Sequence, residues 1–393
     1  PEAVPLQSTA QFQGVFQGPV IPLDAHFRFL AACLLAVAVI AQARGDDSTY
    51  ERIWRHAELY KNDSEDAWLQ RFALSGRAQG DYAWFDADEG DYDDLRWRRF
   101  RFGFTSAMAG GVTVNFEGDF DLNNSLGDTY QRLTDAHIDW KASETMAFKV
   151  LKHSAGFTLD GYTSSKKLLT PERNNLTNNL WFTAEYFTGI SVRGKLDKRL
   201  TYKAGLFAND DSDELGIDGA SYFSMLSAAY SLAPDLGLET ARINLDYVYN
   251  DKDPEANTRD LSHVVSLSSQ WAHNDWGLST DLSAGDGYYS QSDLWGLVVM
   301  PYYSFSERTQ LVVRYTHLES DGDNGLRLNR YESSVVDGRG DDYDEYFLGL
   351  NLFFYGHRFK WQTGLHYTRM EDDADDGGEY DGWGVISGLR VYW

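Results

Sequence analysis

Apolar and polar residues alternate with a period of two along most of this chain, nearly to its last residue. From residue 72 to residue 84 the even positions are apolar, aromatic or glycine, and the odd positions are mostly polar. Segment 99–104 repeats the pattern, with phenylalanine at every even position opposite Arg99 and Arg101. Because successive side chains of a strand point to opposite faces, each segment predicts a strand with one lipid-compatible side and one wet side.

Comparable segments recur at short intervals and predict about sixteen strands. They lie near residues 72–84, 99–104, 112–117, 136–141, 146–153, 189–196, 200–208, 221–232, 241–250, 261–271, 275–285, 294–305, 309–318, 344–355, 358–369 and 382–393. The last segment keeps one parity from Trp383 to the aromatic Trp393. Pairing this strand with the first one would remove both sheet edges. The expected fold is therefore all-β, a transmembrane antiparallel β-barrel.

A soluble β-sandwich would also alternate, but it buries its apolar faces against each other and seldom needs so many aromatic residues at strand ends. Aromatic residues make up 15% of this chain, although its mean hydropathy is only -0.46. Aromatic girdles at two membrane interfaces explain this composition better. The tryptophans in or near predicted strand ends are Trp84, Trp140, Trp271, Trp295, Trp361 and Trp383.

The beginning of the chain has a different character. A short apolar stretch, Phe29–Ile40, precedes Ala41-Gln42-Ala43, which is typical of a secretory signal and too short to span a bilayer as a helix. Residues 1–43 are thus predicted to be a signal segment with an upstream extension, 44–66 a periplasmic N-terminal segment and 67–393 the barrel. The single Cys33 excludes an internal disulfide and a multi-cysteine metal site. A lipoprotein cleavage box at this cysteine is disfavoured, since most of the apolar run follows it.

The net charge of -25 argues against nucleic-acid binding, which needs clustered lysine and arginine. The acidic residues gather in short runs between the predicted strands, where solvated loops are expected. One run, Asp321-Gly322-Asp323-Asn324-Gly325, is similar to a calcium loop but lacks the spaced terminal glutamate. Divalent cations that bridge lipopolysaccharide are an alternative role for these loops, and plain solvation is favoured.

Signatures of catalysis are missing from the sequence. There is no Gly-x-Ser-x-Gly elbow, no His-Glu-x-x-His and no glycine-rich phosphate loop. The histidines are scattered about one per strand, as expected of polar residues that line a lumen. We therefore expect no enzyme, no cofactor and no metal site. An outer-membrane barrel enzyme and an adhesin with a plugged lumen remain the alternatives to a channel.

Several segments together resemble the family of phosphate-selective porins of the O and P type, over about Ile53 to Trp393. The segments that carry the resemblance are 74–79 (LSGRAQ), 98–104 (RRFRFGF), 133–138 (LTDAHI), 163–166 (TSSK), 169–173 (LTPER), 179–183 (NLWFT) and 346–351 (YFLGLN). The resemblance implies a trimeric sixteen-stranded barrel with a long third loop folded into the lumen. That loop would be about Ala155 to Leu180, and it makes Lys166, Lys167 and Arg173 candidates for a constriction. The strand before it ends in Leu151-Lys152-His153, where the family usually has a Gly-Lys-Gln-like end.

In the first two predicted strands, arginines occupy the alternate positions that should face the aqueous interior, and they predict a path for anions. Arg77, Arg99 and Arg101 could each present a guanidinium fork to an anion such as phosphate. The alternative is that they pair with carboxylates on neighbouring strands, namely Glu117, Asp119, Asp135 or Asp139. The expected function is an outer-membrane porin for passive diffusion of small hydrophilic solutes, anions such as phosphate in particular. A general or cation-preferring porin is the second reading. The expected partners are outer-membrane lipid and lipopolysaccharide, small anionic solutes and two further copies of the chain.

Overall fold

The computed structural model describes residues 47–180, 185–209, 214–217, 221–320 and 322–393. The predicted signal segment 1–43, with Cys33, lies outside these residues. Among the residues described, no helix has the length and apolar character needed to cross a membrane.

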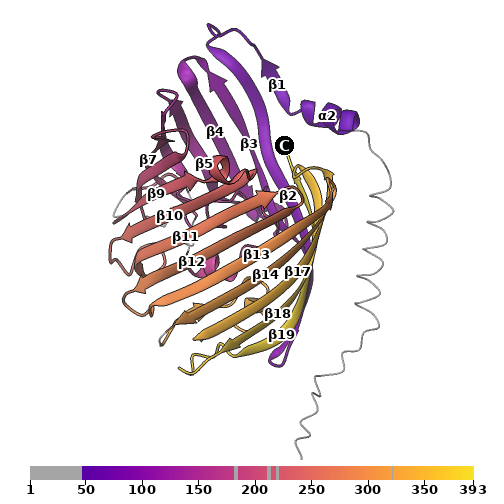
Figure 1. Ribbon diagram of the computed structural model, residues 1–393, viewed down its shortest axis with the longest axis vertical. Coiled ribbons are helices and arrows are strands. Elements are labelled where there is room, and N and C mark those ends of the chain that lie inside the picture. Colours follow the sequence, from indigo (N-terminus) through magenta and orange to yellow (C-terminus); the bar gives the residue numbers. More distant parts are fainter. Residues whose placement is uncertain (1–46, 181–184, 210–213, 218–220, 321) are drawn as a thin grey trace, which may run out of the picture. The chain divides into compact units, whose positions relative to one another are not determined.

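Sixteen long antiparallel strands form one closed sheet within the described residues (Figure 1). They are β2 (Leu69–Ala87), β3 (Gly90–Met108), β4 (Val112–Phe120), β5 (Tyr130–Lys141), β6 (Met146–Ser154), β7 (Tyr186–Lys195), β8 (Leu200–Ala208), β9 (Tyr222–Ser231), β10 (Thr240–Asn250), β11 (Leu261–His273), β12 (Trp276–Gly287), β13 (Leu294–Ser306), β14 (Thr309–Ser320), β17 (Asp342–Tyr355), β18 (Phe359–Glu371) and β19 (Tyr380–Tyr392). Each strand pairs with the next one along the chain, and β19 pairs with β2 from Gly382↔Ala87 to Tyr392↔Arg77. The predicted barrel of about sixteen strands is thus confirmed.

A short helix and a short strand precede the barrel. Helix α2 (Asp47–Arg55) leads into β1 (Glu58–Lys61), which pairs with the start of β2. The Trp54 indole donates a hydrogen bond of 2.6 Å to the carbonyl oxygen of Tyr392. The segment before the barrel therefore lies against the seam between the first and last barrel strands.

The two ends of the barrel differ in the length of their connections. At one end the connections are short, with 274–275 and 307–308 as the tightest turns. At the other end they include 121–129, 155–185 and 321–341. Barrels of this kind place short turns in the periplasm and long loops outside the cell. We call these the turn end and the loop end.

The remaining elements are short, and those labelled η are 3-10 helices. They are η1 (Ala109–Gly111), η2 (Leu126–Asp128), α3 (Asn175–Leu180), α4 (Ala233–Leu236), β15 (Leu326–Arg327), η3 (Glu332–Ser334) and β16 (Arg339–Gly340).

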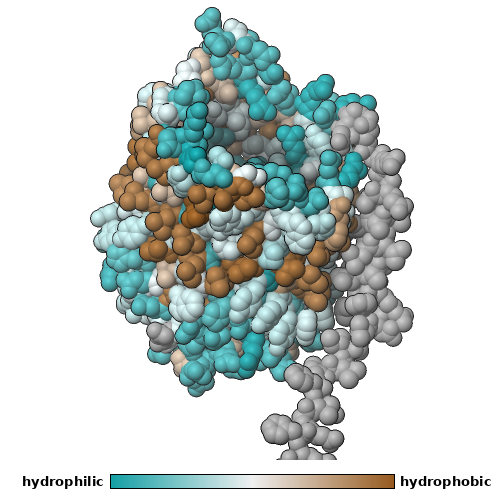
Figure 2. Space-filling view, viewed as in Figure 1, coloured by the Kyte–Doolittle hydropathy of each residue, from teal (hydrophilic) through white to brown (hydrophobic). Residues whose placement is uncertain are grey.

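The outer wall carries an apolar belt with hydrophilic surface on both sides of it (Figure 2). Toward the loop end the belt is bordered by an aromatic row on four successive strands, with ring centroids 4.9 to 6.3 Å apart. The row consists of Tyr315, Tyr346, Tyr367 and Trp383. Toward the turn end, Trp276 packs on Tyr303, with their ring centroids 4.5 Å apart. Such girdles match the two interfaces of an outer membrane.

Two loops fold into the barrel and fill part of its interior. Loop 155–185, which contains α3, buries Leu176 and Leu180, and loop 321–341 buries Leu326 and Leu328. These side chains pack in one apolar cluster with inward-facing residues of the wall such as Val312. The predicted third loop in the lumen, about Ala155 to Leu180, is therefore confirmed. The second inward loop was not predicted.

Candidate solute pathway

Two cavities lie inside the barrel, one toward each end. The larger, of about 1060 Å³, reaches the turn end and is lined by Lys141, Thr145 and Lys195 among others. The smaller, of about 480 Å³, lies toward the loop end and is lined by residues of loops 121–129, 155–185 and 321–341. Their linings meet where Arg101 Nη1 of the smaller cavity lies 3.9 Å from Glu117 Oε1 of the larger one.

Basic side chains outnumber acidic ones in both cavities, although the whole chain carries a net charge of -25. The smaller cavity has eight arginines against four carboxylates: Arg96, Arg98, Arg99, Arg101, Arg132, Arg173, Arg259 and Arg330 against Asp119, Asp121, Glu172 and Glu185. The larger has eight lysines and arginines against four carboxylates: Arg77, Lys141, Lys149, Lys166, Arg193, Lys195, Lys203 and Arg242 against Glu117, Asp135, Asp139 and Glu144. Positive charge that lines a narrow aqueous passage favours anions.

A chain of ion pairs lies where the two cavities approach each other. Arg77 on β2 lines the larger cavity, and its Nη2 lies 2.8 Å from Glu117 Oε1. Arg101 on β3 lines the smaller cavity, and its Nη2 lies 3.2 Å from Asp119 Oδ2. Arg101 also donates to the Tyr186 hydroxyl at 2.5 Å. Both arginines thus face the interior, as their parity predicted.

The predicted alternative, pairing of these arginines with neighbouring carboxylates, is partly correct. Arg77 and Arg101 do pair with Glu117 and Asp119. The other two carboxylates have different partners. Asp135 Oδ1 lies 3.2 Å from His137 Nδ1, and Asp139 Oδ2 lies 2.7 Å from Arg193 Nη1. Pairing and lining the path are therefore not exclusive at these positions.

Ion pairs and hydrogen bonds hold loop 155–185 across the interior. Arg98 forms a two-point pair with Glu172, with Nη2 2.8 Å from Oε2. Burial alone would raise the pKa of Glu172, but the Arg98 charge and its hydrogen bonds outweigh burial and hold this pKa well below its ordinary value. Arg77 Nη1, on β2, donates to Ser165 Oγ at 2.7 Å. Within the loop, Arg173 Nε donates to the carbonyl oxygen of Asp160 at 2.9 Å. The loop is therefore fixed by charged contacts at both cavities.

The remaining predicted residues have different surroundings. Arg99 lines the smaller cavity and donates to Gln79 Oε1 at 3.0 Å. Lys166 lines the larger cavity, with Nζ 5.3 Å from the centre of the Tyr392 ring. Burial, followed by the positive charge of Arg77, lowers the pKa of Lys166 to about 8. Lys167 is exposed and lines neither of these two cavities.

Several lining residues were not predicted, for two different reasons. Arg98 is an extra residue at a register shift, because Gln79 pairs with Arg99 whereas Gly80 pairs with Trp97. A strict period of two would have placed Arg98 on the lipid side. Arg259 and Arg330 belong to loops, whose inward folding leaves no periodic signal in the sequence. By contrast, Lys149 between two apolar neighbours on β6 could have been found from parity.

Comparisons with known proteins agree with this geometry. The family model described as phosphate-selective porin O and P matches residues 72–284. No curated protein matches the chain. An anion-selective porin from Comamonas acidovorans is similar in structure, with 13% identity, a TM-score of 0.57, and 82% of this chain and 99% of that chain covered.

Two further solved structures show the same fold. OmpF from Salmonella typhi, in complex with daunomycin, has 13% identity and a TM-score of 0.60, with 86% of this chain and 100% of that chain covered. The trimer form of the outer membrane protein OmpT of Vibrio cholerae has 12% identity and a TM-score of 0.54, with 82% and 99% covered.

Proposed function

Because this chain belongs to the family of phosphate-selective porins O and P, we propose that its two basic cavities form a diffusion path for small anions, phosphate in particular. The protein is an outer-membrane porin, a channel rather than an enzyme. The observation that supports the anion path is the excess of basic over acidic side chains in both cavities of a chain with a net charge of -25. Diffusion down a gradient then needs neither cofactor nor turnover.

Five of the six predicted site residues have a role in this proposal, and Lys167, which lines neither cavity, has none. Arg99 and Lys166 present positive charge to the two cavities, and Arg77 and Arg101 supply charge where the cavities approach each other. Arg173 braces loop 155–185 internally, through its contact with the carbonyl oxygen of Asp160, and lines the smaller cavity. A guanidinium can hold two phosphate oxygens at once, so the arginine-rich cavity suits a tetrahedral oxyanion.

The test is single-channel recording of the refolded protein in planar bilayers. Under a KCl gradient we expect a reversal potential that shows anion preference, and we expect added phosphate to reduce the chloride current. Arg99→Ala and Lys166→Met should each reduce the anion preference, since each removes one positive charge from a cavity. Lys61→Met is the matched control, because Lys61 lies on β1 and its side chain is 56% exposed.

The other outcomes separate the alternatives. A cation-preferring channel, or one that phosphate does not affect, would identify a general porin in which the buried pairs of Arg77 and Arg101 cancel the charge of the path. A folded protein without any conductance would show a plugged lumen and contradict the diffusion path.

Homotrimeric assembly is also part of the proposal. Large apolar side chains on the outer wall, including Leu95, Phe102 and Phe116, are exposed in the single chain, and the family resemblance implies a trimer. Light scattering of the protein in detergent, corrected for the detergent, should give about three times the chain mass of 44.6 kDa. A mass equal to one chain would contradict the trimer.

The segments before the barrel keep their predicted roles in the proposal. We infer that residues 1–43 are a signal segment and that 44–66 lie on the periplasmic side. The position of α2 and β1 at the turn end supports the second assignment. A single cysteine placed at exposed Asp63 should react with a membrane-impermeant thiol reagent only after the outer membrane is opened. Labelling of intact cells would contradict it.

A further inference from the structure

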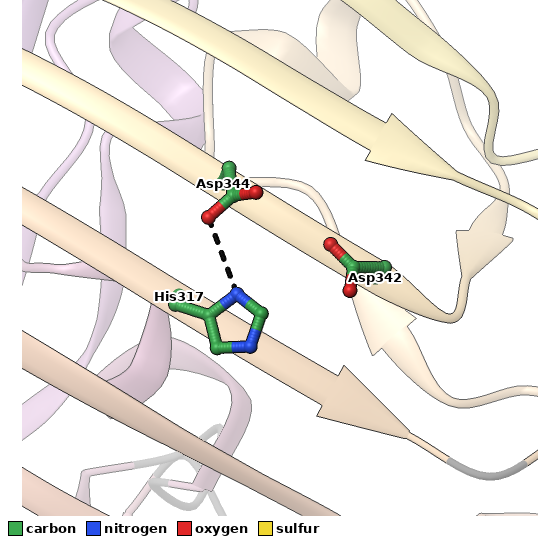
Figure 3. Close-up of side chains that lie close together, drawn as sticks. All are labelled: His317, Asp342 and Asp344. Atoms are coloured by element: carbon green, nitrogen blue, oxygen red, sulfur yellow. Dashed lines mark hydrogen bonds and ion pairs between the residues drawn. The ribbon is translucent and has the colours of Figure 1, made fainter.

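A histidine and two aspartates converge on the outer wall of the barrel, toward the loop end. His317 lies on β14, and Asp342 and Asp344 lie on β17. One ligand atom of each residue lies within 4.8 Å of those of the other two, and His317 Nδ1 lies 3.2 Å from Asp344 Oδ1. Figure 3 shows both carboxylates beside the imidazole ring, on its β17 side. All three side chains are partly exposed, so this cluster is accessible from outside the barrel.

Strand register explains why negative charge concentrates here. Asp342 pairs with Glu319 on one neighbouring strand and with Glu371 on the other, and all three side chains point outward. Like charges directly opposite each other on adjacent strands are destabilising. Arg369, opposite Asp344, is turned toward Glu371, with Nη2 2.6 Å from Oε1. A positive charge between His317 and the two aspartates would offset the remaining repulsion.

Neighbouring aromatic residues fix the orientation of two of the three groups. The Tyr315 hydroxyl donates to Asp344 Oδ1 at 2.7 Å. The Trp295 ring meets the His317 ring edge-on, with centroids 5.5 Å apart. Outer partners of this kind orient metal-binding side chains and raise metal affinity. The Tyr315 contact engages only Oδ1 of Asp344, and the Trp295 contact engages only the ring of His317, so each of the two residues keeps another atom that can bind a metal.

A second cluster of similar composition shows the opposite situation. One ligand atom of each of Glu332, Glu345 and His366 also lies within 4.8 Å of those of the other two, but all three side chains are buried inside the barrel. Arg314 already forms a two-point pair with Glu345 there, so a cation is present in the form of a guanidinium. The outer cluster has no such guanidinium among the described residues that its three members contact.

We propose that His317, Asp342 and Asp344 bind a divalent transition-metal ion of the Zn²⁺ class on the outer wall. An imidazole nitrogen with two carboxylate oxygens suits such an ion, whereas Ca²⁺ and Mg²⁺ prefer oxygen ligands alone. The site lies just beyond the aromatic row at Tyr315 and Tyr346, on the loop side of the belt. Water fills the coordination positions that the three side chains leave open. This site is independent of the diffusion path.

The test is titration of the refolded full chain with ZnCl₂ by isothermal calorimetry in detergent at neutral pH. We expect a saturable site whose affinity falls by more than about tenfold in His317→Gln and in Asp342→Asn. His263→Gln is the matched control: His263 faces outward on β11, and its Nδ1 lies 2.9 Å from the Tyr247 hydroxyl. This variant should bind Zn²⁺ as the original chain does.

Two results would overturn the site. Affinity unchanged in both His317→Gln and Asp342→Asn would show that zinc binds elsewhere or not at all. Displacement of Zn²⁺ by an equal concentration of Ca²⁺ would contradict the assigned class of metal. The characteristic shift of a folded barrel in unheated gel electrophoresis checks that each variant is folded. Because Asp342→Asn removes charge without changing shape, it keeps the test valid if the histidine variant folds poorly.

Discussion

Arg314 on β14 and Glu345 on β17 form a two-point ion pair inside the barrel, with Nε 2.8 Å from Oε1 and Nη2 3.0 Å from Oε2. Both side chains are fully shielded from solvent. Arg314 Nη1 also donates to Thr170 Oγ1 at 3.1 Å. One guanidinium thus joins two wall strands to loop 155–185.

Replacing Arg314 with methionine should destabilise the folded barrel by about 3–5 kcal/mol, because it removes the guanidinium that pairs with both oxygens of the buried Glu345 carboxylate. Urea unfolding in detergent, followed by tryptophan fluorescence, measures the change. The double variant Arg314→Met with Glu345→Leu should recover much of the loss, since it removes both charges. A single variant as stable as the original chain would contradict this account.

Raising the pH from 7 to 9 should reduce the anion preference of the channel. Burial, followed by the positive charge of Arg77, lowers the pKa of Lys166 to about 8, so this amine is mainly charged at pH 7 and mainly neutral at pH 9. Reversal potentials under a KCl gradient measure the change. Lys166→Met should have a lower anion preference than the original chain at pH 7 and should show a smaller change between pH 7 and pH 9. Lys167→Met is the matched control in the same loop and should retain the pH step; an identical pH step in Lys166→Met would refute the assignment.

Glu172→Gln should loosen loop 155–185 and cost about 1.5–3 kcal/mol, because it weakens a charged two-point contact with Arg98. Single-channel current should become noisier. The pKa of Glu172 lies well below its ordinary value despite burial, owing to Arg98. The contact therefore adds stability above the unfolded-state pKa of about 4 and is lost only as the pH falls through the lowered value.

The original channel should accordingly stay quiet at about pH 4, where an ordinary glutamate is half protonated, and Glu172→Gln should be noisy at both pH 4 and pH 7. Asp63→Asn, at a side chain that is 82% exposed, serves as the control for loss of one carboxylate. Equal noise in Glu172→Gln and the original chain would contradict the role of the Arg98 contact.

Gly364→Ala should destabilise the barrel by about 1–3 kcal/mol through overpacking. A Cβ atom at Gly364 would lie 2.0 Å from Cε2 of Phe347, and Gly349, paired with it, leaves room for the same ring. Urea unfolding measures the effect. Thr363→Ala, the outward-facing neighbour, should change stability much less. Equal stability of the two variants would show that the Phe347 ring can shift.

The barrel was predictable from the sequence because each strand carries its own evidence. In β2 the wet parity of Arg77, Gln79 and Asp81 depends only on local alternation, and the structure places all three inside. The lipid outside and the water inside impose this alternation of apolar and polar residues at every step along a strand, so it can be recognised from the sequence of that strand alone.

The lining of the path was only partly predictable. Arg98 reaches the interior through a bulge that breaks the period, and Arg330 reaches it through a loop that folds inward. Contacts such as Asn175 to the carbonyl oxygen of Arg327, 152 positions apart, set the position of these loops. Their energies depend on packing between distant segments, which neither spacing nor propensity encodes.

The seam between β19 and β2 joins residues more than 300 positions apart, as in the pairing of Tyr392 with Arg77. Closure therefore cannot begin until every other strand has been delivered to the membrane. Until that moment the growing sheet presents two unsatisfied edges, each able to template pairing with another chain. The pairing of β19 with β2 is thus the one step that removes both open edges at once.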